Sequence, residues 1–363
     1  MTRVLILTAS VGEGHDRPAK TLSDQLRLEQ PDVEIVVEDS LAAMGRAIRL
    51  IGEGGSGVVF YRFQWLWDFG FWLFAGNAVT RALSQWATAR AGAGGLLRLV
   101  QRVDPDVIVS VYPIATEVLG RLKRDGRLRL PVVAAITDLA AMHYWASPGC
   151  DVHLITHPES IPEVRAVIGP DAVVECVHGF TLPAFLLPRE QAEARAHLGL
   201  PPAGKVVLVS GGGWGVGDVA GAVAEALTID EVSAVVCLCG RNEELRSTIE
   251  HRFGRDERVR VEGFTEEMSE WMAAADALVH STGGLTVLES LMRGCPAISY
   301  GWGRGHVRVN NRAFRSFGLA DVVEQRVELR PALERAFAKG RTVPSGLDGL
   351  PSAASFVLGA RHA

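Results

Sequence analysis

Three glycine-rich turns, each following a short apolar run, could bring backbone amides close to an anionic ligand. The first ends in Gly14 and His15, the second spans residues 211–215, and the third spans residues 281–286. Glycine lets the backbone approach a ligand, and the start of a following helix favours negative charge. Ligands of open α/β sheets bind at the carboxyl ends of the strands, so we expect these turns to form binding sites.

His15 is the candidate general base. It lies between a glycine turn and a helical pattern that we expect to open at Pro18. The positive end of a helix disfavours the imidazolium and keeps the ring neutral, as a base requires. A capping or purely structural histidine is the alternative interpretation.

The third turn has the composition of a diphosphate site. Ser281, Thr282 and two glycines stand between an apolar run and a helical pattern that contains Glu289. Hydroxyls and amides at the start of a helix bind phosphate, and a carboxylate one turn further on could accept hydrogen bonds from ribose hydroxyls. A solvated helix position is the alternative for Glu289.

A nicotinamide dinucleotide site is a competing interpretation of the first turn. Gly12 and Gly14 form a G-x-G pattern, and Asp39 ends the second predicted strand as a ribose-binding acid would. However, Arg17 occupies the third glycine position, where a bulky side chain opposes close packing of helix and strand. The sequence therefore disfavours this site.

The elements that position these residues predict an α/β fold with two Rossmann-like domains facing a central cleft. Apolar runs alternate with helical patterns, which is typical of parallel sheets covered on both faces. The runs lie at residues 4–7, 33–37, 106–112, 131–137, 151–156, 172–177, 205–210, 233–239, 258–264, 276–280 and 296–300. We expect an N-terminal acceptor domain over 1–182, a linker over 183–203 and a C-terminal nucleotide-sugar domain over 204–341. The tail, 342–363, could pack on the first domain.

An aromatic stretch interrupts this pattern. Residues 60–74 contain nine aromatic side chains together with Arg62 and Asp68, so the run is too short and too charged to span a bilayer. Trp and Phe suit the headgroup boundary of a membrane, and nearby arginines could meet anionic lipid. We interpret residues 58–80 as a membrane or acceptor segment. A buried helix or an oligomer contact is the alternative.

The composition indicates a folded protein and excludes several classes of protein. The 363 residues are 48% hydrophobic and 22% charged, as in folded proteins, and the net charge of -5 does not attract nucleic acid. Five cysteines without a C-x-x-C pair predict neither a disulfide framework nor a zinc site and fit a reducing compartment. No signal peptide and no spanning segment are expected. We expect a cytoplasmic protein associated with the inner face of the cell membrane.

These motifs together resemble the GT-B glycosyltransferases. The likeness is to the monogalactosyldiacylglycerol synthase and processive diacylglycerol glycosyltransferase group, and more broadly to the UDP-GlcNAc transferase of peptidoglycan synthesis. It covers most of the chain: a G-x-G-H loop at residues 12–15, a segment with Thr137, Asp138, His143 and Trp145, and above all residues 261–300.

The resemblance implies a role for each group of residues. His15 would be the catalytic base, oriented by Asp138 or Asp39. The implied nucleotide-sugar contacts are Gly14, Gly212, Gly213, Gly263, Phe264, Thr265, Ser281, Thr282, Gly283, Gly284, Leu285, Thr286, Glu289, His306 and Asn310. The implied acceptor and membrane contacts are Phe63, Trp65, Trp67, Phe71, Trp72 and His143.

The implied reaction moves a sugar from a UDP-sugar to a hydroxyl of a lipid such as diacylglycerol, with inversion at the anomeric carbon and without a cofactor. No D-x-D-like motif stands out, so no metal ion is expected. His306 and Val307 replace the Gln-Glu pair that usually contacts the donor sugar, which leaves the sugar open. The alternatives are a soluble transferase acting on a natural product or a polyprenyl-linked acceptor, and a UDP-sugar 2-epimerase.

Overall fold

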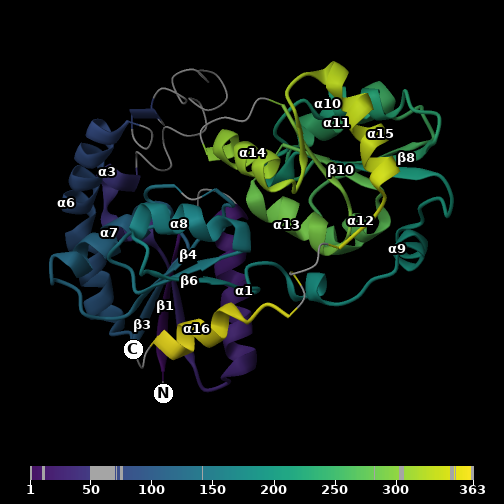
Figure 1. Ribbon diagram of the computed structural model, residues 1–363. Helices are drawn as coiled ribbons and strands as arrows, with labels where there is room; N and C mark the ends of the chain where they lie inside the picture. Colours follow the sequence, from purple (N-terminus) through teal and green to yellow (C-terminus); the bar gives the residue numbers. More distant parts are fainter. Residues whose placement is uncertain are drawn as a thin grey trace. The chain divides into compact units, whose positions relative to one another are not determined.

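The chain folds into two compact units, each built on one six-stranded parallel sheet (Figure 1). Unit 1 comprises Met1–Thr181 and Leu350–Ala363, and unit 2 comprises Leu182–Gly349. The structure is a computed structural model that describes residues 2–9, 13–49, 70, 72–73, 77–140, 142–281, 283–301, 306–343, 347 and 349–360.

The strands of unit 1 run in the order β2-β1-β3-β4-β5-β6. They are β1 (Arg3–Thr8), β2 (Glu34–Asp39), β3 (Val107–Ser110), β4 (Val132–Ala135), β5 (Val152–Ile155) and β6 (Val173–Cys176). The helices are α1 (Glu13–Glu29), α2 (Ser40–Met44), α3 (Arg46–Arg49), α6 (Ala78–Val103), α7 (Pro113–Arg124), η3 (Pro158–Ser160), α8 (Ile161–Ile168) and α16 (Ala353–Gly359). Each of the six predicted runs of this part overlaps one strand.

Helices cover both faces of this sheet because its central strands are apolar throughout. Alternate residues of β1, such as Leu5 and Leu7, share one core with α2, α6 and α7. On the other face α1 packs against β1 and α16 packs against β3 and α1 (Figure 1). This two-sided burial is what continuous apolar runs predict.

Unit 2 repeats the plan with the strand order β12-β11-β10-β7-β8-β9. Its strands are β7 (Lys205–Ser210), β8 (Val232–Leu238), β9 (Val259–Glu262), β10 (Ala277–His280), β11 (Ala297–Tyr300) and β12 (Asp321–Val323). Its helices are η4 (Pro183–Leu186), α9 (Gln191–Leu198), η5 (Gly212–Trp214), α10 (Val219–Ala226), α11 (Glu243–Phe253), α12 (Met268–Ala274), α13 (Gly284–Met292), α14 (His306–Phe317), η6 (Arg326–Glu328) and α15 (Leu329–Lys339).

The side chains of β7 alternate between two cores. Val207 and Val209 pack with α10, α11 and α15, whereas Val206 and Leu208 pack with α9 and α12. The three-residue strand β12 adds an edge that the sequence did not predict, because so short a run carries no periodic signal.

The first helix begins earlier than the sequence predicts. α1 starts at Glu13, so Pro18 lies inside it and does not open it. Proline lacks the N–H that would bond four residues back, but its fixed φ is helical, so a helix can pass through it near its start. As a result His15 lies within the first turn of α1.

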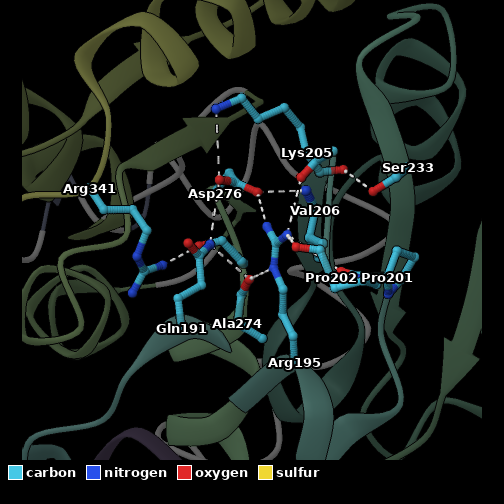
Figure 2. Close-up of polar contacts among 12 residues, drawn as sticks. Gln191, Arg195, Pro201, Pro202, Lys205, Val206, Ser233, Ala274, Asp276 and Arg341 are labelled. Carbon is cyan, nitrogen blue, oxygen red and sulfur yellow. Dashed lines mark hydrogen bonds and ion pairs between the residues drawn. The ribbon is translucent and has the colours of Figure 1, made fainter. Parts of the chain in front are cut away.

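Residues 183–203, predicted as a linker, are instead part of unit 2. Arg195 of α9 is buried and donates to the Asp276 carboxylate at 2.6 Å, just before β10 (Figure 2). Asp276 also accepts from the backbone N–H of Val206 at 2.7 Å, and Gln191 donates to the Ala274 carbonyl at 3.1 Å. These buried bonds fix α9 to the amino edge of the sheet.

The end of the chain returns to unit 1. The backbone N–H of His178 donates to the Pro351 carbonyl at 3.0 Å, and that of Ala353 donates to the His178 carbonyl at 2.8 Å. Ala353, Ala354 and Val357 of α16 are fully buried. Unit 2 extends to Gly349, beyond the predicted boundary at 341.

Candidate active site

Both sheets have a point where the strand order reverses. In unit 1 the strand β1 lies between β2 and β3, and in unit 2 the strand β7 lies between β10 and β8. At such a point the loops after two neighbouring strands leave toward opposite faces of the sheet, and open α/β sheets bind their ligands there. The predicted glycine turns follow β1, β7 and β10, so they lie at these two positions.

His15 follows β1, and its ring contacts residues that follow β3. Nδ1 lies 2.9 Å from the carbonyl oxygen of Val111, and the ring packs edge-on against Tyr112 with ring centroids 5.1 Å apart. A carbonyl only accepts hydrogen bonds, so Nδ1 carries a proton, and in the neutral ring Nε2 is the nitrogen without one. This is the tautomer that a base acting through Nε2 needs.

Asp39 has a local role at the end of β2. Its carboxylate caps α2 by accepting from the backbone N–H groups of Leu41 at 2.8 Å and Ala42 at 3.1 Å. The helix cap therefore explains why an acidic residue ends this strand, and no ribose contact is needed to explain it. The Val111 carbonyl, and not Asp39, is the group seen to orient the His15 ring.

The loop after β4 contains a strained residue. Tyr144 has a φ of +80° and is only 1% exposed, and its hydroxyl lies 2.7 Å from Ser84 Oγ of α6. Ser84 Oγ also donates to the Arg81 carbonyl at 2.9 Å, so the Tyr144 hydroxyl is the donor in the first bond. Burial, and then the charge of Arg81, lower the pKa of the neighbouring His143, which is therefore neutral at pH 7.

Asp138 lies in the same loop. Its carboxylate accepts a hydrogen bond from Trp145 Nε1 at 2.5 Å, which ties together the two ends of the predicted segment from Thr137 to Trp145. The role of Asp138 in orienting His15 stays a prediction.

The loops after β7 and β10 pack against each other in unit 2. Gly217 has a φ of +95°, and a Cβ there would lie 2.3 Å from Ser281 Oγ, so the close approach requires glycine. Ser281 Oγ donates to the Tyr300 carbonyl at 2.8 Å, and α13 then begins at Gly284. The first N–H groups of α13 have no acceptor within the helix and can bind an anion.

The loop after β8 lies between the loops after β7 and β9. A Cβ on Gly240, whose φ is +61°, would lie 2.4 Å from the carbonyl oxygen of Gly212 and 2.6 Å from that of Gly213. A Cβ on Gly263, which follows β9, would lie 3.7 Å from the carbonyl oxygen of Gly240. The loops after β10, β7, β8 and β9 therefore form one row along the carboxyl edge of the sheet.

Phe264 and Thr265 end this row, and both line a cavity of about 560 Å³. The Arg241 guanidinium lies 3.9 Å from the centroid of the Phe264 ring. Thr265 Oγ1 accepts from the backbone N–H of Glu267 at 3.0 Å and from Trp271 Nε1 at 3.3 Å. The Thr265 hydroxyl thus stabilises the turn, and the backbone groups of the turn can bind a ligand.

The remaining predicted donor contacts lie in helices or outside the described residues. Glu289 of α13 is 6% exposed and Asn310 of α14 is fully buried, while His306 is the first residue of α14. Their contacts with ribose and sugar stay predictions. Thr282, Phe63, Trp65, Trp67 and Phe71 lie outside the described residues, whereas Trp72 is described and is half exposed.

Sequence reasoning missed three groups that the structure brings to these edges. They are the Val111 carbonyl, which sets the His15 tautomer, and the side chains of Trp214 and Arg241. The first could not be found because a carbonyl carries no sequence signal. Trp214 does carry a sequence signal, since it is the one large side chain within GGGWGVG.

Two family models match this chain. That of monogalactosyldiacylglycerol (MGDG) synthase matches residues 15–173, and that of the glycosyltransferase family 28 C-terminal domain matches residues 206–345. The chain belongs to the MGDG synthase and family 28 glycosyltransferase family. The first match begins at His15, and the second contains the whole row of glycine loops.

Relatives of this glycosyltransferase family agree with the assignment. "Probable monogalactosyldiacylglycerol synthase 2, chloroplastic" of Oryza sativa subsp. japonica is 31% identical over 328 residues, which cover 81% of this chain and 65% of the relative. "Processive diacylglycerol beta-glucosyltransferase" of Staphylococcus carnosus is 26% identical over 245 residues, which cover 66% of this chain and 61% of the relative. The chain thus spans less than two thirds of the length of these relatives.

The fold of this chain is similar to that of a solved glycosyltransferase structure. MurG of Acinetobacter baumannii has a TM-score of 0.60 at 14% identity, covering 100% of this chain and 99% of MurG. Together with the two parallel sheets, this likeness confirms the predicted GT-B fold. Among the described residues, no helix combines the length and the apolar composition needed to cross a membrane.

Proposed function

We propose that this chain transfers a hexose from a UDP-sugar to a hydroxyl of a lipid acceptor such as diacylglycerol, with inversion at the anomeric carbon. The observation that carries the proposal is the position of His15, whose ring follows β1 and donates a hydrogen bond from Nδ1 to the Val111 carbonyl, so that Nε2 is the ring nitrogen that would act as the base. The family assignment supplies the class of reaction, and the names of the relatives suggest the lipid acceptor.

The donor nucleotide would bind to unit 2. Its diphosphate would lie at the N-terminus of α13 beside Ser281, where helix amides and the helix dipole favour negative charge. The uracil edge would meet the backbone of residues 263–265, and the ribose would meet Glu289. The glycines of the row support this binding because Gly217 and Gly240 bring neighbouring loops so close together that neither position has room for a Cβ.

The acceptor hydroxyl would give its proton to His15 Nε2 as its oxygen attacks the anomeric carbon. The bond from that carbon to the diphosphate oxygen breaks, and UDP leaves with the electron pair. The resulting imidazolium keeps its Nδ1–H bond to the Val111 carbonyl, which favours the charged form. Amides at the start of α13 stabilise the charge that develops on the diphosphate.

A basic helix with an apolar outer face supports a membrane site for this chemistry. Along α6, Val79, Leu83 and Trp86 are between 51% and 80% exposed, at helical spacing. The helix contains four arginines and no acidic residue. Apolar side chains flanked by arginines are typical of helices that lie on anionic membranes. We therefore propose that the protein acts at the inner face of the cell membrane.

The test is product formation from defined substrates. Purified protein is incubated with diacylglycerol-containing vesicles and a panel of UDP-sugars, and the lipids are analysed by mass spectrometry. A lipid whose mass increases by one hexose with a single donor supports the proposal and identifies the sugar. Hydrolysis of the donor without formation of a glycolipid would indicate that the acceptor is a polyprenyl-linked or soluble compound. Conversion of a UDP-sugar into its 2-epimer would contradict the transferase.

A further inference from the structure

The glycine loop after β7 carries one large side chain, and that side chain faces solvent. Trp214 is 59% exposed. The backbone around it is tightly closed, because a Cβ on Gly211 would lie 2.6 Å from the carbonyl carbon of Gly215. A loop so compact leaves no space beneath it for an indole. Exposed apolar surface at a binding edge is typical of a ligand contact.

The loop presents Trp214 on the side of β8 and β9. The backbone N–H of Arg241, after β8, donates to the Gly213 carbonyl at 2.9 Å, and Asn242 Nδ2 donates to the Trp214 carbonyl at 3.4 Å. A Cβ on Gly215 would lie 2.7 Å from the Cys239 carbonyl oxygen. Further along, Gly217 contacts Ser281, which follows β10. Trp214 therefore lies away from the expected diphosphate position.

The neighbouring loop, after β8, carries a second flat group. The Arg241 guanidinium lies 3.9 Å from the centroid of the Phe264 ring, and Phe264 is itself 39% exposed. Because the Arg241 backbone is bonded to the residue before Trp214, the indole and the guanidinium come from loops in direct contact. Both are planar groups that stack well on aromatic faces.

We propose that Trp214 and Arg241 form the platform on which the base of the donor nucleotide stacks. This inference rests on the proposed function, which assigns a nucleoside diphosphate to unit 2. Contacts with the backbone of residues 263–265 would address only the edges of the base. Trp214 and Arg241 would add an apolar and a cationic surface on which the flat face of the base can stack.

The test measures binding of UDP and of UDP-glucose by calorimetry to the full chain and to its variants. Trp214→Ala is expected to raise both dissociation constants about tenfold, because stacking on one base is worth about 1–3 kcal/mol. Trp214→Phe keeps an aromatic face and is expected to stay within about threefold of the wild type. Arg241→Ala is expected to weaken both ligands several-fold. The matched control is Arg252→Ala, since Arg252 also lies over a phenyl ring, that of Phe253, at the far end of α11.

Fluorescence distinguishes stacking from a structural role of the loop. UDP should quench indole emission in the wild type, and Trp214→Phe should lose that quenching while still binding UDP. Unchanged affinity in Trp214→Ala would overturn the platform, and so would a loss confined to UDP-glucose, which would place the indole on the sugar. If the wild type binds another nucleoside diphosphate and not UDP, the proposed donor fails, and the same variants test the platform with that ligand. If it binds none, both proposals fall.

Discussion

At the scale of single residues, the chemistry depends on backbone carbonyls and burial more than on pairs of charged side chains. His15 is given its tautomer by a carbonyl, and Tyr144 keeps a left-handed φ of +80° because its buried hydroxyl is bonded to α6. Strained residues of this kind persist only where their surroundings hold them, and they gather at functional sites. Both residues follow strands of unit 1, His15 in the first turn of α1 after β1 and Tyr144 in the loop after β4.

Replacement of His15 by alanine should reduce turnover far more than donor binding. Loss of a general base costs about 100-fold to 10,000-fold in rate, whereas we assign the nucleotide to unit 2. Steady-state kinetics and UDP calorimetry on the same preparation check this. Wild-type turnover in His15→Ala would end the assignment of the base, and a parallel loss of UDP affinity would make His15 a donor contact.

Acid should destabilise unit 2 through His280. Burial lowers the pKa of this residue to about 4, while an unfolded histidine has a pKa of about 6.5. Between these values the unfolded state binds a proton that the native state does not, so stability falls as the pH decreases from about 6.5 to 4. The loss at one such site is about 3 kcal/mol.

Urea unfolding of the wild type and of His280→Gln over this pH range tests the prediction. The variant should be less stable at neutral pH but should show a flatter pH dependence. Exposed His251, changed to glutamine, is the matched control and should leave the profile as it is. An unaltered slope in His280→Gln would mean that other groups cause the acid sensitivity.

At the scale of elements, loops and helices carry the function and the sheets position them. Four loops from β10, β7, β8 and β9 meet in one row, and the contacts at Gly217 and Gly240 require a glycine. Opposite them, at the amino edge of the same sheet, Arg195 and Asp276 anchor α9 (Figure 2). The carboxyl edge of the sheet thus carries the candidate binding loops, and the amino edge carries contacts that stabilise unit 2.

Serine at Leu83 and at Trp86 should weaken binding to anionic vesicles. Burying one such side chain in a membrane is worth about 1.5–3 kcal/mol, so each change should lower the partition coefficient about tenfold or more. Co-sedimentation with phosphatidylglycerol vesicles measures this. Val327→Ser, at a 75% exposed position of η6, is the matched control. Equal binding of all three variants and the wild type would assign membrane contact to other parts of the chain.

Removal of the Arg195 charge should destabilise unit 2. Arg195→Met leaves the Asp276 carboxylate, which is 12% exposed, without its closest cation, and breaking a pair this largely buried costs about 3–5 kcal/mol. The control is Arg330→Met, which breaks the exposed pair with Glu334 and should cost less than about 1 kcal/mol. Urea unfolding compares them. Similar losses in both variants would show that α9 is held mainly by its apolar contacts.

The repeated apolar runs were enough to predict the two parallel sheets, and the glycines were enough to place the candidate loops. What failed has a common cause, which is dependence on distant residues. The prolines between residues 183 and 202 suggested a linker, but the partner of Arg195 is 81 positions away. The tautomer of His15 depends on a carbonyl 96 positions away. Neither contact can be read from the residues nearby in the sequence. The same holds for the stacking of Arg241 on Phe264, which joins the loops that follow two different strands.

At the scale of the whole molecule, unit 1 is assembled from two separate stretches of chain. Residues up to Thr181 build its sheet, and residues from Leu350 add α16 to one face. Everything between them forms unit 2. The two units can therefore differ in stability although one chain passes through both.

Truncation after Gly349 should destabilise unit 1 alone. It removes three fully buried side chains of α16 and uncovers the surfaces of α1 and β3 on which the helix packs. Hydrogen exchange measured by mass spectrometry should show faster exchange in peptides from α1 and β3 and unchanged exchange in peptides from β7 and β10. Faster exchange in both units would contradict their independence, and no change in either would show that α16 contributes little.

The return of the chain to unit 1 also has a mechanical consequence. Tension applied between residues 2 and 360 enters the molecule at β1 and at α16, and both belong to unit 1 (Figure 1). The contacts that hold α16 to α1 and β3 bear this load first, while unit 2 lies on a closed loop of chain that remains slack. In a pulling experiment α16 should detach before any strand of unit 2 is stretched.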